Sequence, residues 1–170
     1  SVLAFNLPSI ELLNYEADDL IATYVDQILK LGAKVTIVSS DKDLMQLFKK
    51  DVRIYDPMKN KFITNEDVKT KFGVTPDKVV DVQSLAGDSS DNVPGVPGIG
   101  VKTAAELINK YKTLENLLDK AQEIKQNKRR ETILENKDKA LISKKLVTLK
   151  KDVPVKDNLE DFILKNIDKD

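Results

Sequence analysis

The chain has 170 residues, of which 41% are hydrophobic and 33% charged, and its net charge is zero at neutral pH. It contains neither cysteine nor histidine. Disulfides, thiol or serine–histidine nucleophiles and ordinary zinc sites are excluded, because they need thiolate or imidazole groups. Carboxylates remain, and these suit hard cations such as Mg²⁺ and Mn²⁺. With no apolar run near the ~18 residues of a membrane span and no signal-peptide pattern at the start, we expect a cytoplasmic protein.

The charges are unevenly distributed along the chain. Residues 1–101 carry 11 basic and 15 acidic side chains, residues 102–151 carry 14 and 7, and residues 152–170 carry 3 and 6. The net charges of the three segments are therefore −4, +7 and −3. An acidic half followed by a basic segment is what a protein needs to hold cations in one place and phosphates in another.

The first half of the chain alternates between helical and strand patterns. Apolar spacing predicts a helix over 15–31, with Asn14 as its N-cap and Gly32 as its stop. Residues 34–39 are β-branched and nearly continuous, which is typical of a buried parallel strand. A short helix over 42–48 and a second strand over 52–55 follow. This alternation predicts an α/β sheet domain.

From Thr64 onward the pattern is helical. Thr64 and Asp67 resemble a capping box, and Thr75-Pro76 starts a helix that Gly87 closes. After a loop at 88–100, further helices are predicted over 101–111, 113–120 and 129–149. We therefore predict an α/β core over 1–87, a helical lobe over 88–151, and an acidic tail or linker over 152–170.

Acidic residues gather in three clusters. The members are Glu16, Asp18 and Asp19; then Asp41 and Asp43; then Asp88 and Asp91. The first cluster lies in the first turn of a helix, where carboxylates also favour the helix dipole. The second follows the strand over 34–39, where a helix cap would explain one carboxylate but not two. The third lies in a loop, where ordinary turn chemistry is an alternative.

The first two clusters are expected at the edge of an α/β sheet where ligands bind. Carboxylates that converge there repel one another unless cations are present. Two hard cations could activate a water and stabilise the attacking and leaving oxygens of a phosphodiester displacement. The sequence therefore predicts metal-assisted phosphodiester hydrolysis, with all three clusters converging in one cavity. The candidate catalytic residues are Asp18, Asp19, Asp41 and Asp43.

A glycine-rich segment runs from Val93 into the helix predicted from residue 101. Glycine lets a backbone approach closely, and exposed N–H groups at a helix start form an anion site. A dinucleotide fingerprint would have to follow a strand, whereas this segment follows a helix and an acidic loop; a purely structural tight turn is the other alternative. Backbone amides recognise phosphate without reading bases, so we expect sequence-independent DNA binding. The candidate DNA-binding residues are Gly95, Gly98, Ile99, Gly100, Lys102 and Thr103.

Basic residues downstream of this segment could extend a track for DNA. They are Lys125, Lys128, Arg129, Arg130, Lys144, Lys145, Lys150 and Lys151. Each by itself is equally a solvated helix position. Aromatic residues are not interleaved with these charges, so base stacking is not indicated on this part of the chain.

Four motifs together resemble the 5′-nuclease domain of bacterial DNA polymerase I. They are YEADD at 15–19, SSDKDLMQL at 39–47, GDSSDNVPGVPGIGVKTA at 87–104 and KALISKKLVTL at 139–149. The resemblance implies a Rossmann-like (PIN-like), mostly parallel sheet with a helix-three-turn-helix DNA-binding lobe. It implies a metal-dependent 5′→3′ exonuclease and flap endonuclease that removes 5′ ends and RNA primers in replication and repair.

By the same resemblance, all seven acidic residues of the three clusters form the metal shell for two Mg²⁺ or Mn²⁺ ions. The glycine turn grips duplex backbone and in relatives holds K⁺. The partners implied are DNA with a 5′ flap or 5′ end and a following polymerase domain, in the bacterial nucleoid.

One departure from the family pattern concerns the N-terminal portion. In the family, this portion carries the first strand, two more metal-site aspartates and a helical arch. This sequence has no counterpart of these parts, and we expect Ser1 to begin within a helix. A chain without these parts is expected to be poorly active alone. A non-catalytic, duplex-DNA-binding fragment is the alternative function.

Overall fold

The computed structural model describes residues 7–163, so the expected helix at Ser1 lies outside the described residues. The chain divides into two compact units, one made of residues 1–35 and 149–170 and the other of residues 36–148. No helix among the described residues is long and apolar enough to cross a membrane.

The first unit is built on helix α1, Ala17–Lys30. The helix buries Leu20, Ala22 and Val25. Its N-cap is Glu16 rather than the predicted Asn14, which lies in a preceding turn with φ 69°. The helix thus begins two residues later and ends one residue earlier than predicted.

The C-terminal segment of this unit packs on α1. The N–H of Val153 donates to Thr23 Oγ1 at 3.3 Å, and Val153 is buried. A short 3₁₀ helix, η5 (Leu159–Phe162), places Phe162 edge-on to Tyr24, with ring centroids 5.2 Å apart. The segment predicted as a tail or linker therefore contacts α1 through Val153 and Phe162.

The second unit begins with a three-stranded sheet. Its strands are β1 (Val35–Val38), β2 (Val52–Asp56) and β3 (Lys61–Phe62), in the order β1-β2-β3. β2 and β3 are antiparallel, with Tyr55 opposite Phe62. Both predicted strands are present, but β1 was predicted to be buried and buries only Ile37 while Val38 is exposed. The hairpin to β3 was missed.

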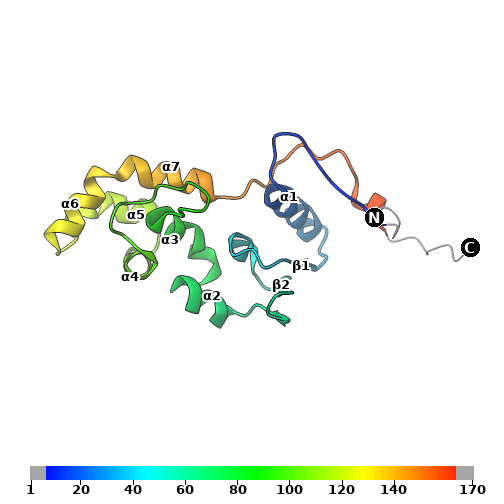
Figure 1. Ribbon diagram of the computed structural model, residues 1–170, viewed down its shortest axis with the longest axis horizontal. Coiled ribbons are helices and arrows are strands. Elements are labelled where there is room, and N and C mark those ends of the chain that lie inside the picture. Colours follow the sequence, from blue (N-terminus) through cyan, green and yellow to red (C-terminus); the bar gives the residue numbers. More distant parts are fainter. Residues whose placement is uncertain (1–6, 164–170) are drawn as a thin grey trace, which may run out of the picture. The chain divides into compact units, whose positions relative to one another are not determined.

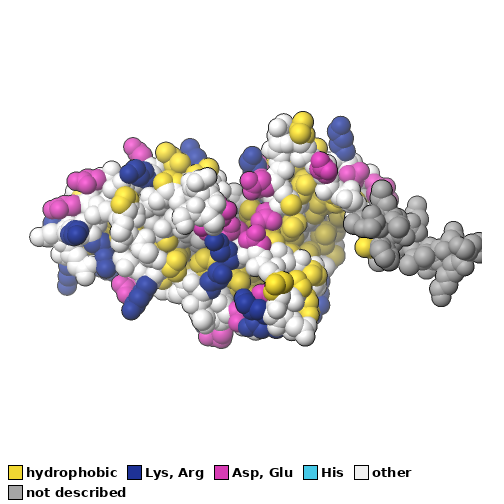
Figure 2. Space-filling view, in the orientation of Figure 1, with side chains coloured by type: hydrophobic (Ala, Val, Ile, Leu, Met, Phe, Trp, Pro, Cys, Tyr) yellow, Lys and Arg dark blue, Asp and Glu magenta, His cyan; other side chains and the backbone are white. Residues whose placement is uncertain are grey.

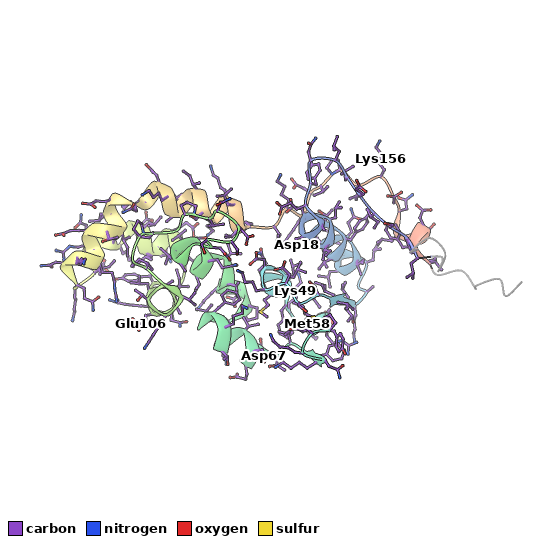
Figure 3. All side chains as sticks on the ribbon, viewed as in Figure 1. Asp18, Lys49, Met58, Asp67, Glu106 and Lys156 are labelled. Atoms are coloured by element: carbon purple, nitrogen blue, oxygen red, sulfur yellow. The ribbon has the colours of Figure 1, made fainter. Side chains whose placement is uncertain are left out.

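Buried Asp56 closes the turn of this hairpin. Its Oδ1 accepts from Ser40 Oγ at 2.7 Å and from the N–H of Met58 at 3.0 Å. Met58 lies in the turn (Figure 3). The hydrogen bond from Ser40 foremost, followed by those from Lys59, lowers the pKa of Asp56 to about 2 against the opposing effect of burial. Asn60 adopts a left-handed conformation with φ 51°, which asparagine tolerates in turns.

Between the first two strands lies η2, Asp43–Leu47, which is a 3₁₀ helix instead of an ordinary one. It buries Leu44, Met45 and Leu47. The segment thus docks on the core by its apolar residues and leaves Asp43 at its first position.

The remaining elements are helical. They are α2 (Asn65–Phe72), η3 (Pro76–Lys78), α3 (Val79–Ala86), α4 (Val101–Tyr111), α5 (Leu114–Asp119), η4 (Ala121–Glu123), α6 (Asn127–Glu135) and α7 (Lys137–Val147). Helix α3 is central: it packs against α4 and α7 (Figure 1). Its residues Val79, Val82 and Leu85 are fully buried.

The capping box of Thr64 and Asp67 is confirmed, and so is the helix over 101–111. The single helix over 129–149 is wrong, because the chain breaks at Asn136. The amide of Asn136 donates to the carbonyl of Thr132 at 2.8 Å. Asparagine side chains compete with helical backbone hydrogen bonds in this way.

Candidate functional site

The second and third acidic clusters are adjacent in the second unit. Asp41 and Asp43 follow strand β1, while Asp88 and Asp91 follow helix α3. The Nζ of Lys42 forms an ion pair with the carboxylate of Asp88. Residues more than forty positions apart in the sequence are therefore joined through this lysine.

The loop that carries the third cluster is closed by backbone hydrogen bonds. The N–H of Asp88 donates to Val93 O at 3.0 Å, and the N–H of Val93 donates to Asp88 O at 2.8 Å. The Asp88 side chain accepts from the N–H of Ser90 at 3.0 Å. The carboxylate of Asp88 is thus fixed at the base of a short closed loop.

Asp43 links the second cluster to helix α3. Its Oδ1 accepts from Gln83 Nε2 at 2.6 Å, and its N–H donates to Asp41 Oδ1 at 2.9 Å. Burial raises the pKa of Asp43, and the charges of Asp41 and Asp91 raise it further, against the hydrogen bond from Gln83. Asp43 therefore lies in a negative field made by both clusters.

Lys42 occupies a cation position within that field. Its hydrogen bond with Asp88 raises the Lys42 pKa against the opposing effect of burial, and the charges of Asp43 and Asp91 add to the rise. The same bond lowers the pKa of Asp88. The surroundings offer oxygen donors only, which fits a hard divalent cation. Over residues 7–163, no three acidic side chains form a group that could hold a metal ion.

The first acidic cluster belongs to the other compact unit. Glu16 is exposed at the start of α1 and caps no amide with its side chain, and Asp18 is half-buried. Asp19 Oδ1 accepts the N–H of Lys150 at 2.8 Å, which ties the C-terminal segment to α1. The convergence of this cluster with the other two stays a prediction.

Two of the predicted DNA-binding residues hold the glycine turn together. The N–H of Gly95 donates to Ser143 Oγ at 2.9 Å, and a Cβ at Gly95 would lie 2.7 Å from the carbonyl carbon of Ala86. Ile99 is buried, and its N–H donates to Val96 O at 3.0 Å. The N–H groups of both residues are thus already engaged within the protein.

Gly98, Ile99 and Thr103 line a hollow, whereas Gly100 and Lys102 are not part of its lining. Gly98, Gly100 and Lys102 are exposed and Thr103 is half-buried. The hollow has a volume of about 440 Å³. The glycine turn and α4 line one side, and Lys128, Arg129 and two polar residues at or just before α6 line the other. Arg129 also approaches Glu106 on α4 at 3.7 Å, and Figure 3 labels Glu106 on this helix.

The start of α4, next to this hollow, has amide groups with no partner inside the helix. The N-cap residue is Gly100, which has no side chain to cap the helix. The first backbone hydrogen bond runs from Ala104 N to Gly100 O at 2.9 Å. The preceding N–H groups have no partner within the helix, so they can bind an anion. The arrangement suits a phosphate of a nucleic-acid backbone.

The predicted basic track is not continuous. Lys144 forms ion pairs with Asp81 at 2.8 Å and Glu115 at 2.6 Å, and Arg130 donates to the carbonyl of Ile124 at 3.0 Å. Figure 2 shows basic and acidic side chains mixed over α6 in the face in view. Lys128 and Arg129 are the track residues that border the hollow.

Sequence reasoning missed Lys42, Gln83 and Ser143 as parts of the site. Lys42 had a signal, since it stands between two cluster aspartates in the sequence. Gln83 and Ser143 had none, because each contacts a residue at least 40 positions away.

Comparison with known proteins places the chain in a family. Residues 74–170 match the model of the 5′-3′ exonuclease C-terminal SAM fold, and residues 1–73 match that of the 5′-3′ exonuclease N-terminal resolvase-like domain. The chain belongs to the 5′-3′ exonuclease family. This family membership agrees with the resemblance that the four sequence motifs indicate.

Several relatives of this exonuclease family align over most of the chain. DNA polymerase I of Rhizobium leguminosarum is 57% identical over 161 residues, which cover 95% of this chain and 16% of that protein. A 5′-3′ exonuclease of Buchnera aphidicola is 40% identical over 156 residues, covering 88% of this chain and 54% of that protein. The chain therefore spans only part of the length of these relatives.

Solved structures share the fold. A mutant of the T5 5′-exonuclease superposes with a TM-score of 0.77 at 23% identity, covering 84% of this chain and 58% of that one. The T5 flap endonuclease in a complex with DNA and metal ions gives a TM-score of 0.76 at 22% identity, covering 84% of this chain and 53% of that one. The α/β fold with a helical lobe is thereby confirmed.

Proposed function

We propose that the chain forms the metal- and DNA-binding core of a 5′→3′ exonuclease and flap endonuclease, which hydrolyses DNA or RNA-primer phosphodiesters in replication and repair. The observation that carries the proposal is the ion pair of Lys42 with Asp88 beside Asp43, in a chain of the 5′-3′ exonuclease family. It joins two carboxylate clusters around one cation position. Work on such a substrate implies a place at the bacterial nucleoid.

The carboxylates of the three clusters would hold two Mg²⁺ or Mn²⁺ ions. When bound, the ions supply an activated water and stabilise the charge that develops on the reacting phosphate. The T5 flap endonuclease with metal ions and DNA has this fold, which supports the assignment. The proposed metal residues are Glu16, Asp18, Asp19, Asp41, Asp43, Asp88 and Asp91.

The protein's own residues position these groups. Gln83 holds the carboxylate of Asp43 through a 2.6 Å hydrogen bond, and such outer partners orient metal ligands. The amides at the start of α4, with Lys102 and Thr103, hold the duplex by its phosphates, which carry no sequence information. The carbonyl oxygens of the turn at Gly98 are the proposed ligands for K⁺.

Cleavage of a labelled 5′-flap duplex with Mg²⁺, by the protein that carries this sequence, tests the proposal. Because catalysis depends on positioning, Asp43→Asn and Asp91→Asn should each lower the cleavage rate by about a hundredfold or more. Asp119→Asn, on the exposed side of α5, is the matched control and should leave the rate unchanged.

Chelation of metal by EDTA should abolish cleavage and leave duplex binding. Cleavage that persists in EDTA, or in both site variants, would overturn the metal-site assignment. Duplex binding without cleavage in either Mg²⁺ or Mn²⁺ would instead support the non-catalytic fragment.

A further inference from the structure

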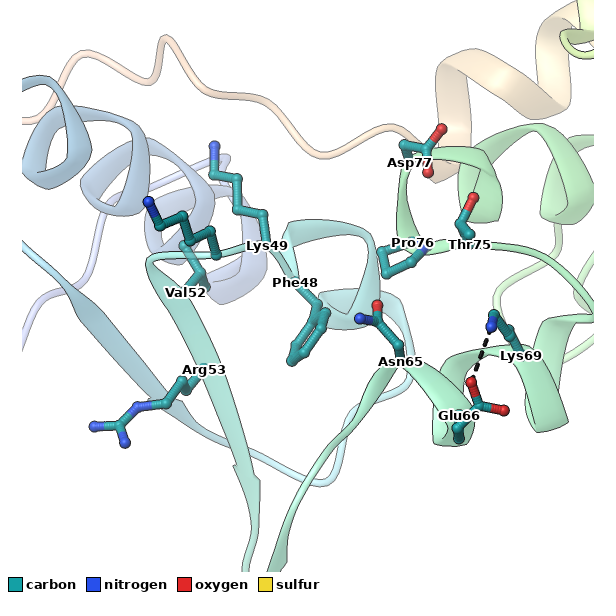
Figure 4. Close-up of a pocket in the computed structure, with 11 residues that line it drawn as sticks. Phe48, Lys49, Val52, Arg53, Asn65, Glu66, Lys69, Thr75, Pro76 and Asp77 are labelled. Carbon is teal, nitrogen blue, oxygen red and sulfur yellow. Dashed lines mark hydrogen bonds and ion pairs between the residues drawn. The ribbon is translucent and has the colours of Figure 1, made fainter.

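A second hollow lies in the same unit and uses none of the acidic-cluster or glycine-turn residues. It has a volume of about 640 Å³ and is lined by the end of η2, the start of β2, the first turns of α2, and η3 with the residue before it. Figure 4 shows it from the side on which β2 and α2 diverge. We refer to it as the β2–α2 hollow.

One wall of the β2–α2 hollow carries uncompensated positive charge. Lys49, Lys50 and Arg53 all line it, and none of them forms an ion pair with another described residue. The guanidinium of Arg53 lies over the ring of Phe62, 5.2 Å from its centroid, so the two lysines are the cations of this wall without a partner among the described residues. On the opposite wall Lys69 is neutralised by Glu66 at 2.9 Å, and Asp77 adds one exposed carboxylate, so the cations of the first wall still outnumber the unpaired carboxylates of the lining. Cations with no carboxylate partner, gathered around one concavity, favour an anionic ligand.

Part of the lining of the β2–α2 hollow is apolar and aromatic. Phe48 and Pro76 are half-buried and Val52 is fully buried. Figure 4 shows the ring of Phe48 and the amide of Asn65 between the basic wall and η3. The Asn65 amide forms no hydrogen bond with another described residue, so its two donors and its acceptor are free.

These features together select the ligand class. A lone phosphate would fill only a small part of this volume, and it would leave the ring of Phe48 and the amide of Asn65 without a contact. A planar base can stack on Phe48 and hydrogen-bond to Asn65, while its phosphate lies against the lysines. We propose that the β2–α2 hollow binds one phosphate-bearing nucleoside.

The choice of this ligand rests on the proposed function, because an exonuclease both holds nucleic-acid strands and releases nucleotides. The nucleoside is either a free monophosphate or one unit of a single strand. Because both present the same base and phosphate to the hollow, the affinities of a free monophosphate and of a short single strand are measured separately.

Binding of deoxyadenosine monophosphate is measured by amide NMR shifts and calorimetry, in EDTA so that metal sites do not contribute. The expected result is saturable binding, with shifts at residues 48–53, 65–69 and 75–77. Deoxyadenosine alone and inorganic phosphate should each bind at least about tenfold more weakly, because each loses one set of contacts. A short oligodeoxyadenylate that binds more tightly than the monophosphate identifies a strand as the source, and equal affinity identifies the free nucleotide.

Variants assign the contacts. Lys49→Ala with Lys50→Ala should weaken binding about tenfold. Phe48→Leu, which keeps an apolar side chain but removes the aromatic ring, should remove most of the preference for the monophosphate over phosphate. Lys71→Ala, on the same helix as Lys69 and outside the hollow, is the control and should change nothing.

Three results would overturn the proposal: shifts confined to the glycine turn, equal affinity for phosphate and the monophosphate, or binding that both the lysine and Phe48 variants leave intact. Flap cleavage by the same variants tests the proposed function separately from the nucleotide site. Variants that lose nucleotide binding but still cleave flaps would show that the hollow binds nucleotide and is not needed for cleavage.

Discussion

Gln83 of α3 donates a 2.6 Å hydrogen bond to Asp43, the first residue of η2, so the central helix of the second unit fixes the second acidic cluster. Gln83 is buried, and its Oε1 has no hydrogen-bond partner among the described residues. One end of this amide is therefore used for positioning, and the other is left unsatisfied.

Gln83→Leu should separate these two effects. It removes a charge-assisted hydrogen bond of about 1.5–3 kcal/mol, but it also removes an unsatisfied buried oxygen that costs about 1–3 kcal/mol. We expect the free energy of unfolding to change by less than about 1 kcal/mol, while metal-dependent cleavage falls at least about tenfold because Asp43 loses its orientation.

Chemical denaturation and flap cleavage of the same preparation measure the two quantities. Gln122→Leu, at an exposed position in η4, is the control. A variant that cleaves like the wild type would show that Asp43 does not depend on this hydrogen bond.

Glycines 95 and 98 should differ in their tolerance of alanine. Both have positive φ, +58° and +73°, but a Cβ at Gly95 would overlap the backbone of Ala86 and Gly87, whereas one at Gly98 meets nothing within 4 Å. Gly98→Ala should cost about 1 kcal/mol from backbone strain alone. Gly95→Ala adds steric overlap in a packed interior and should cost about 3 kcal/mol or more.

Urea unfolding of the two variants measures the difference. Each serves as the control for the other, because the residue change and the left-handed backbone are shared. Equal costs at both positions would contradict the close packing of Gly95 on Gly87.

Asp19 combines a structural contact with a proposed metal role, and two substitutions can divide them. Asparagine keeps the Oδ1 that accepts the N–H of Lys150 at 2.8 Å but loses the charge. Asp19→Asn should therefore keep the Lys150 amide protected from hydrogen exchange and lower metal-dependent cleavage. Asp19→Ala should lose both, with exchange at Lys150 faster by about five- to tenfold for one hydrogen bond of ~1 kcal/mol.

Hydrogen exchange followed by NMR gives the first readout, and flap cleavage gives the second. If Asp19→Asn cleaves normally, Asp19 is not a metal residue and only its structural contact remains. If the Lys150 amide stays protected in Asp19→Ala, the hydrogen bond does not hold the C-terminal segment.

Features that depend on neighbouring residues could be predicted from the sequence. The capping box of Thr64 and Asp67 and the helix over 101–111 arise from side chains within a few positions of one another, and the structure has both. The hairpin to β3 was missed because β3 has two residues, too few to show an alternating pattern. The break at Asn136 was missed because one asparagine barely changes a helical periodicity.

The contacts that shape the candidate site are long-range. Gln83 reaches Asp43 across 40 positions, and Asp19 reaches Lys150 across 131. No local propensity encodes such pairs, because the tertiary fold brings them together. The residue types of the clusters could be predicted from the sequence, but their hydrogen-bond partners could not.

Two lysines from the predicted DNA-binding surface should behave differently when replaced. Lys102 is exposed at the start of α4, where it forms no ion pair with another described residue. Lys144 is held between Asp81, which is buried, and Glu115, at 2.8 and 2.6 Å. The first is available to a phosphate, and the second serves the fold.

Lys102→Ala should weaken binding to all duplexes alike and reduce the slope of log affinity against log salt by about one, because one fewer counterion is released. Lys144→Ala should leave that slope unchanged and lower the free energy of unfolding by about 2 kcal/mol, because it strands the buried carboxylate of Asp81. Fluorescence anisotropy with duplexes of two unrelated sequences at several salt concentrations, together with urea unfolding, measures both effects. A strong preference of the wild type for one of the sequences, or a salt slope that Lys144→Ala changes and Lys102→Ala does not, would contradict backbone recognition at the start of α4.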